Sequence, residues 1–397
     1  MWLVMSPLMK YAAYLPTGRR RWPQRYGTWN MNLPSLPVEL RTVAGIPRDS
    51  VAEAAAFREA PLQCYRDLHP EASRFHRTHA WLELLRVSPQ VRRASEAAGR
   101  SGSVPRAPVI VPERHELTKE LRARAAELGL SALGIARYDP KYTLAQGAGD
   151  WYGDTVIVCI AEEDHAKTQL APSRAAYMAV WDATTDLVEM TAELAGFLEK
   201  KGFRARASSP HQDVLVQNYA VAAGLGQMGL NGQLLTPIAG SRCSISVIYT
   251  DAALVFDEPR DFGVPKVCDA CKVCVQRCPP GAIPARRGIY RGIERIQIKK
   301  DRCFPTVAQA HGCAVCVKVC PVQKFGLQPV IDEFTKTGRI LGKDTDDLEG
   351  YDWIDGRHYG PGVRPKLDDA FLHPSGWVFD PDRKLPPGPP KKENLFS

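Results

Sequence analysis

The chain has 397 residues, of which 44% are hydrophobic and 24% charged, and its formal net charge at pH 7 is +8. These values are ordinary for a globular protein of two or three domains, and no apolar run reaches the roughly 20 residues that a membrane-spanning helix requires. The arginines at 19–21 follow the apolar N-terminal stretch, which reverses the order of a secretory signal, so we expect a cytoplasmic protein.

Regular patterns begin after residues 1–112, a region rich in Pro, Arg and Ala to which the sequence assigns no role. Beyond it, the periodicity predicts helices at 113–128 and 173–200, and strands at 132–136, 155–160, 203–207 and 244–249. The strand at 155–160 is a continuous apolar run, as expected where both faces of a sheet are covered. Alternating helices and strands indicate a layered α/β domain over residues 113–262.

A glycine-rich segment lies between the last two of these strands. Gly224, Gly226 and Gly229 match the G-x-G-x-x-G pattern, which marks a dinucleotide site when it links a strand to a helix. Here the preceding residues look helical, and no acidic residue follows at the expected distance. We therefore prefer a tight glycine turn, in which the backbone closely approaches another group, to a dinucleotide site.

Eleven cysteines are present, and eight of them lie between Cys268 and Cys320. Clustered cysteines are more typical of a metal site than of a disulfide framework, which belongs to small secreted domains. The first run is Cys268-x2-Cys271-x2-Cys274-x3-Cys278-Pro279, and Cys313-x2-Cys316-x3-Cys320-Pro321, preceded by Cys303, partly repeats it. This spacing is that of bacterial two-cluster ferredoxins, and zinc, which usually takes two separated pairs, would leave it unused.

In two-cluster ferredoxins, the fourth cysteine of each run ligates the other cluster. We therefore assign one [4Fe–4S] cluster to Cys268, Cys271, Cys274 and Cys320, and the other to Cys278, Cys303, Cys313 and Cys316. The module that holds both clusters is predicted over residues 263–328. Residues 329–397, with prolines crowded near the end, are expected to form an extended tail.

From residue 113 to residue 328 the chain resembles the superfamily of cobalamin-dependent reductive dehalogenases and epoxyqueuosine reductases. The resemblance is carried by six segments ahead of the cysteine runs, ELGLSALGIA at 127–136, AAGLGQMGLNG at 222–232, LLTP at 234–237, GSR at 240–242, YTD at 249–251 and DFGV at 261–264. It implies an α+β protein, in which a nitroreductase-like α/β domain that holds a corrinoid is followed by a bacterial-ferredoxin-like module with two [4Fe–4S] clusters.

The resemblance also implies a reaction and its partners. The clusters would reduce the cobalt of the corrinoid (cobalamin), with electrons from a reduced ferredoxin, a flavodoxin or a reductase. A proton donor above the corrinoid would complete the reduction of a small-molecule substrate. The corrinoid would carry out the difficult step, while protein groups position and protonate the substrate.

The two branches of the superfamily differ in several sequence features, and this chain has some features of each branch. The short Cys303-x9-Cys313 spacing resembles the dehalogenase branch, whose tyrosine proton donor aligns near Thr184. Tyr177-x4-Asp182 instead resembles the epoxyqueuosine reductases, and the positive charge would suit their tRNA substrate. A third interpretation is an iron–sulfur electron-transfer protein without catalytic activity.

By this resemblance, Asp182 or Tyr177 would donate the proton and Arg242 would stabilise negative charge on the substrate. An aspartate serves as a general acid only where burial raises its pKa toward neutrality. The alternatives are a solvated helix residue for Asp182, a core residue for Tyr177 and a surface ion pair for Arg242. The candidate corrinoid-binding residues, for which core packing or a tight turn is the alternative, are Asn218, Tyr219, Gly224, Gly226 and Asn231.

Overall fold

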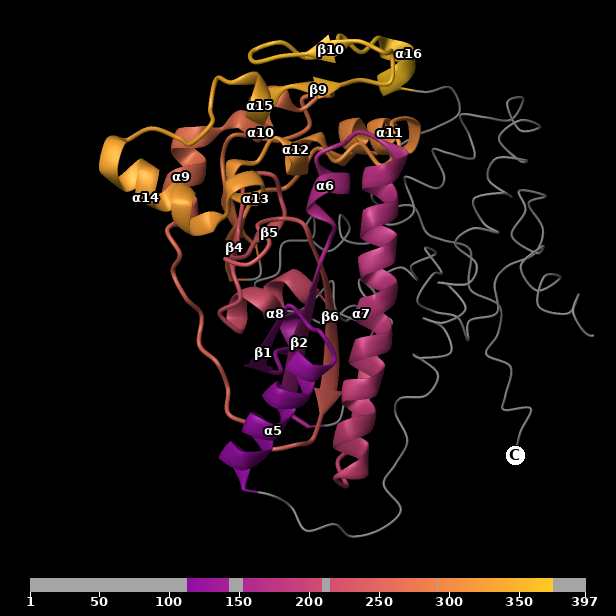
Figure 1. Cartoon of the computed structure of the whole chain (residues 1–397), viewed down its shortest axis with the longest axis vertical. Helices are drawn as coiled ribbons and strands as arrows, with labels where there is room; N and C mark the ends of the chain where they lie inside the picture. Colours follow the sequence, from indigo (N-terminus) through magenta and orange to yellow (C-terminus); the bar gives the residue numbers. More distant parts are fainter. Residues whose placement is uncertain (1–112, 143–152, 209–214, 291, 374–397) are drawn as a thin grey trace, which may run out of the picture.

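The computed structural model describes residues 113–142, 153–208, 215–290 and 292–373. The N-terminal region up to residue 112 and the last part of the expected tail, from residue 374, lie outside the described residues. Figure 1 shows a domain built around one sheet, with the cysteine module and the C-terminal elements gathered at one end of it.

The sheet contains four strands in the order β1-β2-β6-β3, and each neighbouring pair is antiparallel. β2 and β6 pair along their full length, so the sheet has a long, regular centre. The strands occur where the sequence predicted them, which confirms all four: β1 (Ala132–Arg137), β2 (Thr155–Glu162), β3 (Ala205–Ser208) and β6 (Cys243–Thr250).

Two helices cover one face of this sheet. They are α5 (Arg114–Glu127) and α7 (Arg174–Lys200), and both confirm predicted helices. On α7, Leu187 and Leu194 belong to the same buried cluster as Ile157 of β2. In Figure 1 the long α7 runs beside β6, with α5 near its lower half. Most of the apolar side of α7 is therefore used to bury the sheet.

The opposite face of the sheet is covered by α8 (Val216–Ala222). Tyr219 of this helix and Val158 of β2 belong to a second buried cluster. The sheet is thus the middle of three layers, which explains why β2 is buried along both faces. Together the layers give a mixed helix-and-strand domain, as expected from the alternating pattern.

The glycine-rich segment forms a tight turn between α8 and a short hairpin of β4 (Gln227–Met228) and β5 (Leu234–Leu235). Gly224 has φ +64°, and a Cβ atom on it would lie 2.4 Å from the carbonyl oxygen of Glu258. A Cβ on Gly226 would likewise lie 2.4 Å from a carbonyl oxygen of β5. A helix precedes the turn and a strand follows it, so the geometry confirms the tight turn and excludes a dinucleotide site.

The cysteine module consists of short helices around a buried cluster of apolar and cysteine side chains. A small hairpin of β7 (Gly288–Tyr290) and β8 (Ile293–Arg295) separates the two cysteine runs. The helices of the module are α9 (Val264–Cys271), α10 (Val273–Arg277), α11 (Lys300–Gln309), α12 (Val315–Lys318) and α13 (Pro321–Phe325).

The chain after the module differs from the extended tail that we expected. Up to residue 373 it folds back over the module, and Tyr351 and Trp353 are buried in the same apolar cluster as the cysteines. Because this segment is otherwise polar and rich in glycine, its few buried apolar side chains were not recognised from the sequence. The elements are α14 (Leu327–Thr337), α15 (Asp346–Glu349), β9 (Tyr351–Asp352), β10 (His358–Tyr359) and α16 (Asp369–Leu372).

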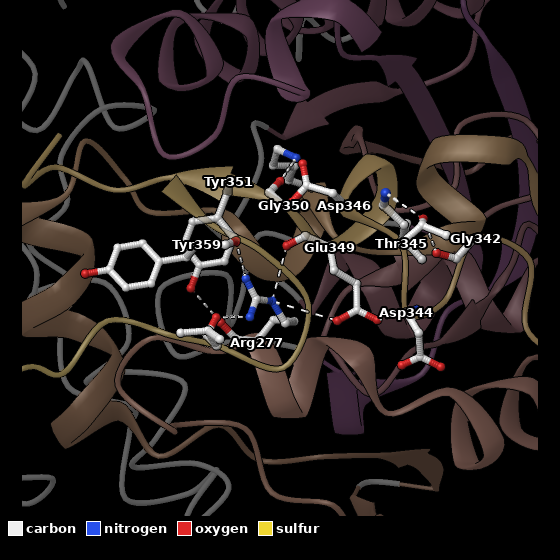
Figure 2. A network of polar contacts seen from close by, with 12 residues as sticks. Arg277, Gly342, Asp344, Thr345, Asp346, Glu349, Gly350, Tyr351 and Tyr359 are labelled. Carbon is white, nitrogen blue, oxygen red and sulfur yellow. Dashed lines mark hydrogen bonds and ion pairs between the residues drawn. The ribbon is translucent and has the colours of Figure 1, made fainter. Parts of the chain in front are cut away.

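The guanidinium of Arg277, one residue before Cys278, attaches this C-terminal segment to the module (Figure 2). It donates to the carbonyl oxygens of Glu349 at 3.2 Å, Tyr359 at 2.6 Å and Val363. The phenol of Tyr351 donates in return to the Arg277 carbonyl at 3.2 Å. Because Arg277 is only 1% exposed, these carbonyl contacts are what makes its burial tolerable.

Two shorter elements complete the fold. The turn η2 (Pro140–Tyr142) lies beside α8, and α6 (His165–Thr168) connects β2 to α7. The Asp164 side chain caps α6 by accepting from the Lys167 N–H at 2.8 Å. None of the described helices is both long and apolar enough to cross a membrane.

Candidate metal centre and neighbouring polar site

The eight cysteines of the two runs are free thiols, and their electrostatic contacts divide them into two groups. The first cysteine set consists of Cys268, Cys271, Cys274 and Cys320. The second cysteine set consists of Cys278, Cys303, Cys313 and Cys316. Cys316 also interacts electrostatically with Cys274 and Cys320 of the first set, so the two sets are adjacent. In this grouping, the last cysteine of each run belongs to the set that contains the other cysteines of the opposite run.

The backbone repeats the same turn in both runs. Lys272 lies between the second and third cysteines of the first run and has φ 54° and ψ 11°. Ala314 holds the equivalent position in the second run and has φ 55° and ψ 15°. Non-glycine residues rarely adopt this left-handed conformation. Its recurrence at matching positions indicates that each C-x2-C turn is shaped to direct successive thiols toward a common centre.

The thiols of the first cysteine set line a cavity of about 330 Å³, counted with its opening to solvent. Leu230, Leu235 and Val322 are among the apolar side chains that complete its wall. Within the described ranges, no three His, Cys, Asp or Glu side chains meet closely enough to hold a single metal ion. Since a four-iron cluster spreads its four thiolates around a larger body than one ion, the donor set fits a cluster better than zinc.

Burial raises the pKa values of these thiols. The pKa of Cys271 is raised to about 11 and that of Cys320 to about 12, in both cases mainly by desolvation. Backbone N–H groups act in the opposite direction, as at Cys278, whose sulfur accepts from the Ala282 N–H at 3.3 Å. The protein alone therefore leaves the thiols protonated at neutral pH, and bound iron has to supply the charge that stabilises thiolates.

The two predicted proton donors lie on the first half of α7. Asp182 is paired with Lys167 Nζ at 3.2 Å, and its side chain is 40% exposed. The burial that an acid role requires is absent, so the solvated alternative describes Asp182 better. Tyr177 is also exposed, at 44%, and its ring contacts Gly312, the residue before Cys313. It is therefore not a core residue and lies beside the second cysteine set.

Arg242 is buried directly before the first residue of β6, contrary to the surface ion pair that was its alternative. Its Nη1 donates to the carboxylate of Glu162 and to the carbonyl oxygen of Glu163 at 3.3 Å. Its Nε is buried without a hydrogen-bond partner among the described residues. Desolvation lowers the pKa of the guanidinium, which nevertheless stays charged at neutral pH. One donor of a buried cation is thus left available to an acceptor that the described residues do not provide.

Glu163 was missed from the sequence because nothing in its neighbourhood distinguishes it from a surface glutamate. It is 8% exposed, and desolvation raises the pKa of its carboxyl group to about 7. Its charge also acts on Cys243, the residue after Arg242. Among the acidic side chains considered so far, Glu163 is the one whose environment suits a group that holds a proton near neutral pH.

Gln323 was also missed from the sequence, although its position three residues after Cys320 places it next to a predicted cluster ligand. Its Oε1 accepts from Gln169 Nε2 at 2.9 Å, which joins the end of α6 to the cysteine module. Its own Nε2 is buried without a partner among the described residues, as is the hydroxyl of Ser241. A Cβ on Gly240 would lie 2.5 Å from the Gln323 Cα, so residues 240–242 abut the turn that carries Cys320.

The five candidate corrinoid-binding residues do not lie in one place. Tyr219 is a core residue whose hydroxyl bonds to both backbone groups of Asp139 at 3.0 Å. Asn218 is buried and accepts from Arg295 at 3.3 Å. Gly224 and Gly226 are explained by the tight turn.

Asn231 differs from these four residues, because it lines the cavity of the first cysteine set. Its amide also donates to the carbonyl oxygen of Cys316 at 3.4 Å, so it contacts the second set as well. Of the five candidates, Asn231 is the one that the fold brings to the metal centre.

Comparison with known proteins gives one family match and several relatives. The family described as a 4Fe-4S dicluster domain matches residues 267–324. A tetrachloroethene reductive dehalogenase of Desulfitobacterium hafniense is 31% identical over 211 residues, which cover 49% of this chain and 37% of the relative. An epoxyqueuosine reductase of Synechococcus sp. is 28% identical over 178 residues, which cover 43% of this chain and 54% of the relative.

The fold has solved counterparts. A catabolic reductive dehalogenase superposes with a TM-score of 0.59 at 20% identity, covering 87% of this chain and 56% of the other. A second reductive dehalogenase structure gives a TM-score of 0.57, covering 71% and 48%. The chain spans little more than a third of the length of the dehalogenases that it matches in sequence. The chain is thus similar to both the reductive dehalogenases and the epoxyqueuosine reductases, and its residues 267–324 match an iron–sulfur dicluster domain.

Proposed function

We propose that this protein is a corrinoid-dependent reductase that uses two [4Fe–4S] clusters, one in each cysteine set, to reduce an organic substrate. The observation that carries the proposal is the contact between Gly240 and Gln323. Gly240 directly precedes Ser241 and Arg242, which carry buried polar atoms without hydrogen-bond partners among the described residues. A substrate held by these groups would lie next to a cluster that can deliver electrons.

The chemistry of the donor atoms fits both cofactors. Eight thiols in two adjacent sets match the ligands of two four-iron clusters. For the corrinoid, the relevant groups are the unpartnered donors of Arg242 and Gln323, and Asn231 at the cavity wall. Leu170, Tyr177, Val180 and Ile238 are exposed large hydrophobic side chains that would be available to pack against a large ring. A bound corrinoid would supply electron transfer at its metal, which no side chain here offers.

The side chains then have separate tasks. Arg242, buried and positive, would stabilise negative charge that develops on the substrate or its leaving group. Proton donation has three candidates, Tyr177, Asp182 and Glu163. Burial favours Glu163, while the sequence resemblance favours the other two. The α/β unit over residues 113–262 is proposed to be nitroreductase-like, and a small reduced redox protein is the proposed electron donor.

The test begins with anaerobic reconstitution of the whole chain with iron, sulfide and cobalamin. About eight irons per chain, four for each cluster, together with corrinoid retained through gel filtration, is the expected result. Because the sequence relatives include tetrachloroethene reductive dehalogenases, halide release from chlorinated and brominated compounds is measured next. Full iron content without retained corrinoid would leave a non-catalytic electron-transfer protein and reject the proposal.

Variants then separate the residue roles. Arg242→Met should abolish halide release while iron and corrinoid are retained, and Arg339→Met, at a side chain that is 79% exposed, is the matched control. Loss of the true proton donor should lower kcat by about 10² to 10⁴, in Glu163→Gln, Asp182→Asn or Tyr177→Phe. If all three variants keep full turnover, none of the three residues is the donor.

The second candidate function is reduction of an epoxide or another activated bond on tRNA. It is favoured by the similarity to epoxyqueuosine reductases and by the net charge of +8. Binding to tRNA that weakens steeply with salt, in a reconstituted protein that releases no halide, would select this function. Absence of tRNA binding at low salt would eliminate it.

A further inference from the structure

Arg287 is a buried cation beside the first cysteine set that the proposed reaction does not yet use. It precedes β7, in the segment between the two cysteine runs, and its side chain is 6% exposed. Its Nη1 contacts Asp269 Oδ1 at 2.5 Å and the Pro265 carbonyl oxygen at 3.4 Å. Both partners belong to α9, the helix that carries Cys268 and Cys271. These contacts fix the guanidinium relative to the first two ligands of the set.

The other two nitrogens of this guanidinium have no acceptor in the part of the chain that the structure describes. Nε and Nη2 of Arg287 are both buried, and neither has a hydrogen-bond partner among the described residues. An unpartnered buried donor is costly, particularly on a charged group, so a native acceptor is expected nearby. The expected acceptor is sulfur, because the same guanidinium contacts Asp269, the residue after Cys268, and Pro265, three residues before Cys268.

We propose that Arg287 is a redox-tuning residue, whose free N–H groups donate to the sulfurs of the cluster in the first cysteine set and raise its reduction potential above that of the other cluster. Reduction adds one negative charge to the cluster, and a buried cation with hydrogen bonds to sulfur stabilises that added charge. Electrons would then come to rest on the first cluster, which is the one whose Cys320 turn abuts Gly240. This inference rests on the proposed cluster content, but not on the corrinoid or the substrate.

The second cysteine set has a different cation near it. Arg364 donates to the carbonyl oxygen of Cys278 at 3.2 Å, and its charge also lowers the pKa of that thiol. Arg364 is exposed, however, so water screens its charge. Arg287 is buried, and two of its nitrogens have no acceptor among the described residues. We therefore expect the larger effect on reduction potential at the first cysteine set.

The experiment is a redox titration of the reconstituted holoprotein followed by EPR, without corrinoid or substrate. Arg287→Met removes the charge and the donors with little change in length. Arg286→Met is the matched control, because its side chain is exposed and adjacent in sequence. We expect Arg287→Met to lower the potential of one cluster by at least about 59 mV, a tenfold change for a one-electron couple. The second cluster and the control should stay at the wild-type potentials.

The outcomes separate this inference from the proposed function. Wild-type protein without two cluster signals would reject the cluster content itself. Two signals with unshifted potentials in Arg287→Met, or an equal shift of both clusters, would overturn the role of Arg287 alone. If Arg287→Met fails to retain iron, Arg287→Gln decides, since it keeps an amide donor but removes the charge, and an unshifted potential in that variant also overturns the inference.

Discussion

The carboxyl group of Glu163 illustrates how a side chain without sequence distinction acquires unusual chemistry by position. It follows the last residue of β2, and its own N–H donates to the Arg242 carbonyl oxygen at 3.0 Å. The backbone ladder therefore continues one residue past the strand and holds the side chain inside. Desolvation raises the pKa of its carboxyl group, because burial disfavours the charged form.

This environment predicts a pH dependence of stability. The folded-state pKa of Glu163 is about 7, above its ordinary value of 4.5, so between these values the folded protein binds more protons than the unfolded one. Stability is therefore full below pH 4.5 and falls as pH rises toward 7, by roughly 3 kcal/mol at most. Glu163→Gln should lose this dependence, so its melting temperature relative to wild type should increase from pH 5 to pH 8.

The control for this prediction is Glu258→Gln, at an exposed glutamate. Its melting temperature should differ from wild type by the same amount at both pH values. A Glu163→Gln difference that is equally constant would show that Glu163 titrates normally, and its candidacy as a proton donor would lose its support.

At the scale of the elements, two glycines should respond in opposite ways to replacement by alanine. At Gly226 a Cβ atom would meet a carbonyl oxygen of Leu235 at 2.4 Å, so Gly226→Ala forces the turn between α8 and β4 to shift. Gly196 lies inside α7 with nothing within 4 Å of an added Cβ. We expect Gly226→Ala to destabilise the fold by about 2 kcal/mol or more, and Gly196→Ala to stabilise it by about 0.5–1 kcal/mol. Thermal melting of the two variants measures both, and equal signs would contradict the predicted packing.

The position of the C-terminal elements depends on the buried side chain of Arg277. Its three carbonyl contacts and its position 4.8 Å from the centre of the Tyr351 ring hold the β9–β10 hairpin on the module. Arg277→Met leaves buried carbonyl groups without donors and should cost about 3 kcal/mol or more.

Limited proteolysis is the direct measurement of this loss. Cleavage within residues 345–373 should become faster in Arg277→Met, while Arg339→Met, at an exposed side chain, should match wild type. Unchanged cleavage together with unchanged melting would mean that the hairpin is held by its apolar anchors, Tyr351 and Trp353, and not by Arg277.

At the scale of the whole molecule, the cysteines of the two sets lie in two apolar clusters of the module. Cys271 and Cys320 are buried among the apolar side chains of the module and the C-terminal elements. The α/β domain has two apolar clusters of its own, one on each face of the sheet. Loss of iron should therefore affect the two halves of the chain unequally.

We predict that chelation of iron from the reconstituted protein lowers the melting temperature of the module and exposes residues 263–373 to proteases. The 113–262 half should keep its helix and strand signal in circular dichroism, because its cores contain no cluster ligand. Reconstitution with iron and sulfide should restore the original melting profile. A single transition that does not respond to chelation would contradict a structural role for the clusters.

The sequence alone determined the features that depend on local spacing. Period and length predicted the two helices and four strands of the α/β domain, because burial on a face repeats every 3.6 or 2 residues along the chain. The cysteine spacing likewise determined the chemistry of the module, since short loops limit which metal groups their thiols can surround.

Only the tertiary structure decided which polar residues are buried and what they meet. Arg287, Glu163 and Gln323 look like ordinary polar residues in sequence, and the exposure of Asp182 was likewise not predictable from its neighbours. The C-terminal elements looked like a tail because few apolar residues mark them. Burial, desolvation and unpartnered donors arise from contacts between segments far apart in the chain, and no local pattern of residues encodes them.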